Sequence, residues 1–446
     1  MKNTLERPAP AATPDTTRRD FVRLAGSGAA TLSALAATKA WAAPAAAPRL
    51  RVGFVSPRTG PLAEFGRSDP FVIDLVRQRT GGRLRVGETN YDLEILDRDS
   101  QSDPTRATQL ARQLINDESI DLMLATSTPE VVNPVADACE AAGMPCLSTV
   151  DPWESWYFGR GARPGQPSPF KWTYHFSFGV QQFAHMYLSS WKLLPTNRKV
   201  GVLYPNDADG NAMREHIVPT LRKGGFTVVD PGAYQDGTTD FSAQIARFKS
   251  AGVQILTGVP LPNDFITFLR QAAQQGLARR LRIVQPAKFG GFPSDVEALG
   301  DLGPRVASNA DWSPAFPYVS PVAGIGGREL ADAYEKATGR QWTQQVGATL
   351  ALFDAGVAAL KNSRTPKDKS ALAAAIKVLD VVTTVGRVNF PGGPVPNVAV
   401  TPVIGTQWIK ARPGSRYKLD FVTVEHADDP RVRIQARLLP YGRQSA

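Results

Sequence analysis

Residues 93–127 read LEILDRDSQSDPTRATQLARQLINDESIDLMLATS, and the fold class can be predicted from this stretch. It begins and ends with short segments, 93–100 and 120–127, that have the length and apolar content at their start or centre expected of strands. Between them, 104–117 carries apolar residues at helical spacing, and Asp103 directly before it is a candidate N-cap. A strand, a helix and a strand in this order predict a parallel βαβ unit with helices packed on the sheet.

The same alternation continues on both sides of this unit. After the segment 312–318, which is rich in aromatic residues and proline, the chain has a helical pattern to about residue 379. The further predicted strands are 49–56, 144–150, 199–205, 226–232, 253–259, 281–287, 383–390 and 401–410. The pattern predicts an α/β protein of two Rossmann-like parallel-sheet lobes joined by a multi-strand hinge. Open parallel sheets of this kind bind ligands at the carboxyl ends of their strands, so we expect a cleft between the lobes.

The first 42 residues have the features of an export signal. Thr16 to Arg23 reads TTRRDFVR, a modestly apolar run follows at 24–37, and Ala40-Trp41-Ala42 resembles a cleavage site. This order resembles a twin-arginine signal, which predicts cleavage near Ala42 and a periplasmic protein. The alternative, a membrane anchor, is disfavoured because the run is too short for about 30 Å of hydrocarbon.

Composition limits the classes of partner. The chain has 446 residues, of which 42% are hydrophobic and 21% charged, as in ordinary globular proteins. Its formal net charge is +10, but the basic residues are scattered and do not form the stripe of a nucleic-acid-binding surface. We therefore expect no nucleic-acid partner, and we expect a monomer without a cofactor or a bound metal.

The two cysteines, Cys139 and Cys146, lie on either side of a predicted reversal at Gly143. Such a reversal brings side chains close enough for a disulfide in an oxidising compartment. Two buried thiols are an equally acceptable interpretation, and both remain open at this point.

Four segments together resemble a known family, the type I periplasmic solute-binding proteins of ABC importers, in the branch of branched-chain amino-acid and amide binders that includes leucine-binding proteins. They are 53–67 (GFVSPRTGPLAEFGR), 95–115, 199–229 and 234–277. The resemblance implies the type I periplasmic binding protein fold. It also implies a division into an export signal (1–42), lobe 1 (49–176 plus 312–379), lobe 2 (177–311 plus 380–427) and a C-terminal tail (428–446).

The resemblance implies a protein that captures a small solute between its lobes and delivers it to an ABC permease in the inner membrane. The solute would be an amino acid, an amide, or an aromatic or hydrophobic carboxylate. Two alternatives are a periplasmic ligand-sensing subunit of a signalling system and an extracytoplasmic enzyme. The second is disfavoured because the sequence contains no recognisable catalytic motif, and we expect no enzyme activity.

The residues that the resemblance implies for the ligand site follow predicted strands of both lobes. In such proteins hydroxyl groups hold a ligand carboxylate, here with help from Lys288, and Asp209 is roughly aligned with a carboxylate that faces a ligand ammonium. Aromatic residues are concentrated between 153 and 178, which favours an apolar or aromatic solute if some of them face the cleft. The predicted site residues are Phe65, Ser127, Thr128, Ser148, Thr149, Trp153, Trp156, Phe178, Asp209, Pro260, Lys288 and Phe289.

Overall fold

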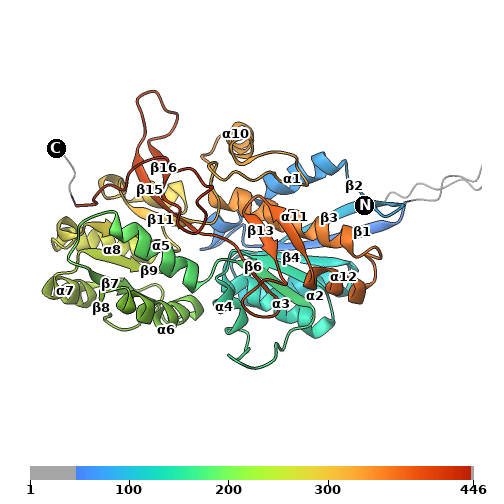
Figure 1. Ribbon diagram of the computed structural model, residues 1–446, viewed down its shortest axis with the longest axis horizontal. Helices are drawn as coiled ribbons and strands as arrows, with labels where there is room; N and C mark the ends of the chain where they lie inside the picture. Colours follow the sequence, from blue (N-terminus) through green and yellow to red (C-terminus); the bar gives the residue numbers. More distant parts are fainter. Residues whose placement is uncertain (1–46, 443–446) are drawn as a thin grey trace, which may run out of the picture. The chain divides into compact units, whose positions relative to one another are not determined.

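The computed structural model describes residues 47–442, so the export signal predicted at 1–42 lies outside the described residues. The largest sheet has seven strands in the order β14-β6-β5-β4-β1-β3-β2, and every pair in it is parallel except β2 with β3 (Figure 1). Its strands are β1 (Arg49–Ser56), β2 (Arg83–Val86), β3 (Thr89–Asp99), β4 (Leu122–Thr126), β5 (Cys146–Thr149), β6 (Thr173–Ser177) and β14 (Val398–Val400). The βαβ unit predicted at 93–127 is confirmed as β3, α2 and β4.

Helices cover both faces of this sheet (Figure 1). On one face, α2 begins as predicted, because the Asp103 carboxylate accepts a hydrogen bond from the Arg106 amide at 2.6 Å. On the other face, α11 contacts β4 and β5, and its near-continuous burial accounts for its apolar sequence. The helices are α1 (Asp69–Thr80), α2 (Pro104–Asn116), α3 (Pro129–Ala142), α10 (Gly327–Thr338), α11 (Gln344–Asn362) and α12 (Lys369–Lys377).

The second lobe contains two smaller sheets. A parallel sheet has the order β10-β9-β7-β8, and an antiparallel sheet has the order β11-β15-β16. The strands are β7 (Lys199–Leu203), β8 (Thr227–Val229), β9 (Ile255–Gly258), β10 (Ile283–Val284), β11 (Ala307–Ala310), β15 (Ile404–Lys410) and β16 (Leu419–Glu425). The remaining helices of four or more residues in the described range are α4 (Trp153–Tyr157), α5 (Val180–Lys192), α6 (Ala208–Lys223), α7 (Ser242–Ala251), α8 (Pro262–Gln274) and α9 (Pro293–Ala298).

One predicted strand is wrong in form. The segment 383–390 was expected as a single strand, but it contributes to a hairpin of β12 (Asp380–Thr383) and β13 (Gly386–Asn389). Gly386 makes the tight return possible, since its φ of 111° is disfavoured for other residues, and its carbonyl accepts from the Thr383 hydroxyl. The period-2 pattern is the same on both sides of such a turn, so it does not reveal the reversal.

Within residues 47–442 the chain passes between the lobes three times, after β6, after β11 and after β14. The segment 380–427, which the sequence assigned to lobe 2, contributes β14 to the large sheet and β15 and β16 to the antiparallel sheet. The described part of the tail packs on the second lobe, where the Tyr441 amide donates to the Arg282 carbonyl at 2.9 Å. The lobe boundaries themselves stay predictions.

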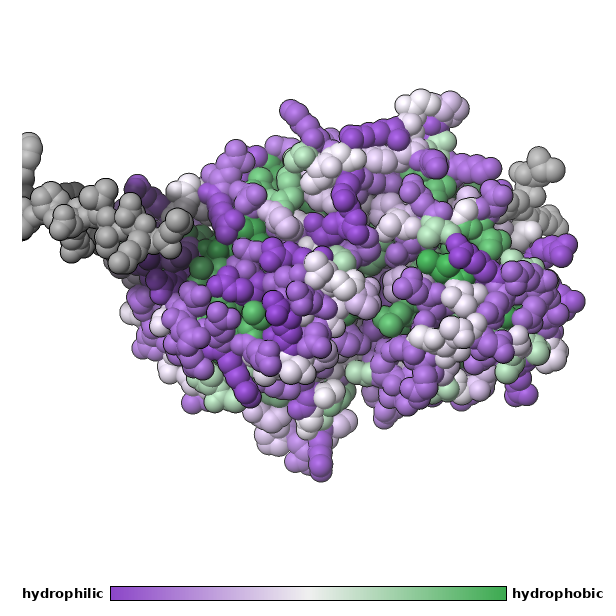
Figure 2. Space-filling model, turned by 180° about the vertical axis from the view of Figure 1, so that it is seen from behind, coloured by the Kyte–Doolittle hydropathy of each residue, from purple (hydrophilic) through white to green (hydrophobic). Residues whose placement is uncertain are grey.

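Apolar side chains are mostly internal. The face in Figure 2 is predominantly hydrophilic, and apolar residues appear on it as small separate patches. Among residues 47–442 we find no helix with the length and apolar character needed to cross a membrane.

Candidate functional site

A cavity of about 50 Å³ lies where the strand ends of the two lobes meet. The large sheet contributes residues that follow its parallel strands, such as Ser127 after β4 and Asp151 after β5. The second lobe contributes Asp209 from the first turn of α6, Lys288 from the loop after β10, and Asp311 directly after β11. This position, at the carboxyl ends of parallel strands, is the one that the fold class predicts.

The Lys288 ammonium is the centre of a buried charge cluster. Its Nζ lies 2.7 Å from Asp209 Oδ2, 3.4 Å from Asp207 Oδ2 and 3.6 Å from Glu130 Oε1. Burial alone would lower the pKa of Lys288, but the three carboxylates outweigh it and hold that pKa well above its usual value. Lys288 is therefore a charged residue that is already compensated.

Two contacts in this cluster connect the lobes. Glu130 belongs to α3 on the large sheet, whereas Lys288 belongs to the second lobe. Likewise the Ser155 hydroxyl, on α4, donates to Asp209 Oδ1 on α6 at 2.7 Å. The structure therefore holds the two sides of the cavity together through polar contacts.

Asp151 is a buried acidic residue of the cavity. Neither of its carboxylate oxygens has a hydrogen-bond partner within the described part of the chain. Burial, and then the charges of Asp209 and Glu130, raise the pKa of Asp151 well above its usual range.

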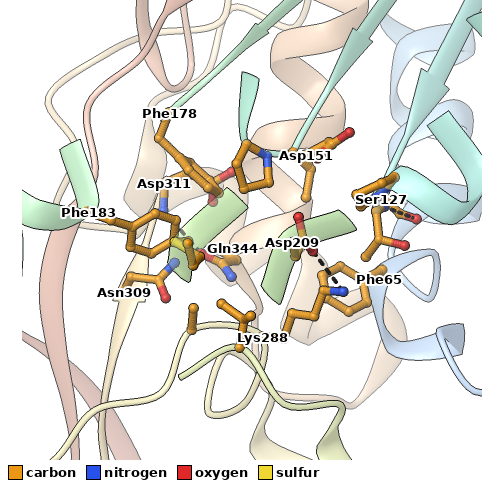
Figure 3. Close-up of a pocket in the computed structure, with 17 residues that line it drawn as sticks. Phe65, Ser127, Asp151, Phe178, Phe183, Asp209, Lys288, Asn309, Asp311 and Gln344 are labelled. Atoms are coloured by element: carbon orange, nitrogen blue, oxygen red, sulfur yellow. Dashed lines mark hydrogen bonds and ion pairs between the residues drawn. The ribbon is translucent and has the colours of Figure 1, made fainter. Parts of the chain in front are cut away.

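The other end of the cavity, in Figure 3, is formed by Phe178 and Phe183 together with Asn309, Asp311 and Gln344. The two phenylalanine rings are 4.9 Å apart in an edge-to-face arrangement. Burial raises the pKa of Asp311 to about 7. This end combines an aromatic wall with groups that can accept hydrogen bonds.

Six of the predicted site residues line this cavity. They are Phe65, Ser127, Thr128, Phe178, Asp209 and Lys288. Their local setting differs from the expectation in one respect: Lys288 and Asp209 contact each other instead of standing apart for opposite charges on a ligand.

The other six lie elsewhere. The hydroxyls of Ser148 and Thr149 donate to carbonyls of β6, those of Tyr174 and Phe176. The remaining four, all buried away from the cavity lining, are Trp153, Trp156, Pro260 and Phe289. Trp156 stacks on His175 at 5.2 Å and Phe289 packs on Phe265 at 4.6 Å, so these rings serve as core packing.

Three polar cavity residues that sequence reasoning missed, Asp151, Asn309 and Asp311, fall into two groups. Asp151 lies just two residues after Thr149, in the loop that the prediction selected, but its side chain and not that of Thr149 lines the cavity. Asn309 and Asp311 belong to β11 and its end, a polar segment, ASNAD, with no strand pattern. No signal in the sequence pointed to the second group.

The two cysteines are free thiols and both are buried. Burial, and then the neighbouring Cys146, raise the pKa of Cys139 well above its usual value. Of the two interpretations left open by the sequence, the structure contains the pair of buried thiols.

Comparison with known proteins identifies the family. Residues 49–409 match the family described as "Periplasmic binding protein". The chain belongs to the periplasmic binding protein family. This family is one of substrate-binding proteins, and its name implies a periplasmic location.

The relatives of this periplasmic binding protein include amino-acid and aromatic-acid binders. Leu/Ile/Val-binding protein homolog 7 of Brucella suis biovar 1 (strain 1330) is 24% identical over 334 residues, 71% of this chain and 79% of that protein. The leucine-binding protein LivK of Thermotoga maritima MSB8 superposes with a TM-score of 0.68 at 18% identity, covering 85% of this chain and 99% of that one.

A third relative was solved with a ligand. The solute-binding protein of an ABC transporter from Rhodopseudomonas palustris BisB5, in complex with 3,4-dihydroxybenzoic acid, has a TM-score of 0.67 at 20% identity, covering 86% of this chain and 99% of that one. Such identities establish the fold, and they confirm the predicted type I architecture of two lobes.

Proposed function

We propose that this protein captures a small solute between its two lobes and delivers it to an ABC permease in the inner membrane. The observation that carries the proposal is a cavity lined by strand-end residues of both lobes, with polar contacts joining its two sides. A solute that touches both lobes favours their closed arrangement, because its contacts are complete only when the lobes are together.

The relatives indicate which solutes to test first. Their names and bound ligands cover branched-chain amino acids and an aromatic acid, so the first candidates are amino acids, amides and aromatic or hydrophobic carboxylates. The aromatic wall of Phe178 and Phe183 suits a solute with an apolar body.

Binding is tested by thermal unfolding of the purified protein against a panel of amino acids, amides, amines and carboxylates. A bound solute at 100 times its dissociation constant adds about 2.7 kcal/mol of stability, which raises the melting temperature measurably. A panel of small solutes in which none changes the melting temperature would contradict the proposal.

Delivery is tested in cells. Deletion of this protein should abolish uptake of the radiolabelled solute that binds, and the wild-type chain should restore uptake. Unchanged uptake together with an altered transcriptional response to the solute would instead favour the ligand-sensing subunit.

The export route is part of the proposal. Replacing the pair Arg18 and Arg19 by lysine should leave an uncleaved precursor in the cytoplasm, whereas the wild-type protein should be recovered from the periplasm with an N-terminus near Ala43. Normal export of the double variant would exclude the twin-arginine route.

A further inference from the structure

Three of the groups expected to bind a ligand carboxylate already have partners. Lys288 is surrounded by three carboxylates, and the hydroxyls of Ser148 and Thr149 donate to backbone carbonyls of β6. The Ser127 hydroxyl oxygen accepts from the amide of Thr128 at 2.5 Å. An incoming carboxylate would have to displace the present partners of Lys288, Ser148 and Thr149, whereas Ser127 only accepts a hydrogen bond and keeps its own O–H.

The remaining hydroxyl, that of Thr128, faces an anion. Although burial alone would raise the pKa of Glu130, the Lys288 ammonium and then the Thr128 hydroxyl lower it below its usual value. Glu130 lies in the first turn of α3, so its own carboxylate occupies the helix end that would otherwise favour an anion. A ligand carboxylate placed there would be repelled by Glu130.

Among residues 47–442, the unpartnered buried side-chain atoms of the cavity are mostly acceptors: carboxyl oxygens of Asp151 and Asp311 and the amide oxygen of Asn309, together with the Thr128 hydroxyl that faces Glu130. Both oxygens of Asp151 and one oxygen of Asp311 are buried, line the cavity and have no hydrogen-bond partner among residues 47–442. A carboxylate oxygen needs a donor when it is buried, and leaving it without one is costly. A ligand with N–H groups would supply those donors.

The charges favour the same ligand chemistry. The cluster around Lys288 contains three carboxylates for one ammonium, and Asp151 and Asp311 add two further acidic groups. A second carboxylate would therefore enter a cavity that already has an excess of acidic groups, whereas a cation would reduce that excess.

Resting on the proposed function, we propose that the solute is a small organic cation that carries at least two N–H donors and no carboxylate. Its charged group donates to Asp151, and its apolar body packs against Phe178 and Phe183. The two rings give that apolar body a wall to pack against.

The test uses solutes of one shape and three charges. Benzamidine, benzamide and benzoate are nearly isosteric but carry a positive, zero and negative charge, and n-butylamine, butyramide and butyrate form a matching aliphatic series. Dissociation constants are measured by calorimetry with the full-length protein. We expect the cation to bind at least tenfold more tightly than the amide in at least one series, and the carboxylate to bind most weakly. A carboxylate that binds as tightly as its matched cation overturns the inference.

A variant locates the charged contact. Asp151→Asn keeps the shape of the side chain but removes its charge, and should weaken binding of the cation by about 10- to 100-fold while changing amide binding much less. Asp121→Asn is the control, because Asp121 pairs with Lys367 outside the cavity. If Asp151→Asn weakens the binding of cation and amide equally, with an unchanged melting temperature of the free protein, Asp151 does not distinguish a charged ligand from a neutral one.

The pH dependence of ligand affinity is an independent test of the inference. The titratable groups that face Asp151 are Glu130, Glu154, Asp209, Lys288 and His175, whose Nε2 lies 2.7 Å from the Asp151 carbonyl oxygen. Burial and the neighbouring carboxylates raise the pKa of Asp151, and a bound cation would lower it, so the affinity for the cation should rise with pH and Asp151→Asn should flatten the dependence. An affinity for the cation that falls between pH 6 and 8 contradicts the inference.

The two proposals fail differently. If the panel yields only solutes with a carboxylate, including zwitterionic amino acids, the cation inference is overturned while the capture of a solute stands. If nothing in the panel or in either series binds, the proposed function and the inference are both contradicted.

Discussion

Lys288 should contribute strongly to the stability of the folded protein, and Lys288→Met tests this. The side chain is only 7% exposed, and its Nζ lies 2.7, 3.4 and 3.6 Å from three carboxylates. At an effective dielectric constant of 20, these distances correspond to attractions of about 6, 5 and 5 kcal/mol. Most of this total offsets the cost of removing the charges from water, so it is not the expected loss.

Removing one partner of a buried ion pair leaves the other charge buried and uncompensated. We therefore expect Lys288→Met to lower the free energy of unfolding by about 3–5 kcal/mol at pH 8. The loss should be smaller at pH 5, because the carboxylates freed by the substitution take up protons there. Lys288 itself stays charged across this range, since its pKa is raised.

The assay is urea unfolding followed by circular dichroism at both pH values. Lys367→Met is the matched control: this lysine lies 3.2 Å from Asp121 but is 55% exposed, so its loss should cost at most about 1 kcal/mol. If Lys288→Met destabilises the protein no more than Lys367→Met, the cluster is not a net stabilising contact and the reasoning is refuted.

Two further expectations concern positions away from the charge cluster. Gly347→Ala should prevent native packing of α11, because an added Cβ would lie 2.1 Å from Trp312 Cγ. Gly356→Ala should fold, because the atom nearest to its added Cβ is 3.2 Å away. Circular dichroism and soluble yield are measured for both variants, and equal results would contradict the packing argument. Burial raises the pKa of Asp69 from 3.8 to about 7, so between these pH values the folded protein keeps a proton on this carboxyl that the unfolded chain loses. The contribution of Asp69 to the free energy of unfolding should therefore fall by about 4 kcal/mol from pH 4 to 8. Asp69→Asn, which retains an acceptor for the Thr349 hydroxyl, should reduce that fall in urea unfolding at each pH, and an unchanged slope would exclude Asp69 as its source.

The alternation of strands and helices was predictable because it depends on local patterns. The spacing of apolar residues in 93–127 and the N-cap at Asp103 depend only on residues close together in the sequence, and the structure contains the strands and the helix that they predict. The rule that parallel sheets bind ligands at strand ends selected loops that line the cavity, as the positions of Phe65, Ser127 and Phe178 show.

Which side chains of those loops face the cavity was decided by tertiary structure. Ser148 and Thr149 are still within β5 and their hydroxyls bond to β6, so the chain presents Asp151 instead. The partners of Lys288 were equally hidden, because Asp209 is 79 residues away within the second lobe and Glu130 comes from the other lobe, so that it approaches Lys288 only when the lobes pack together. The sequence by itself determined an α/β protein with a site at the strand ends. The excess of acidic groups in that site arises from contacts between residues far apart in the chain, which no local pattern encodes.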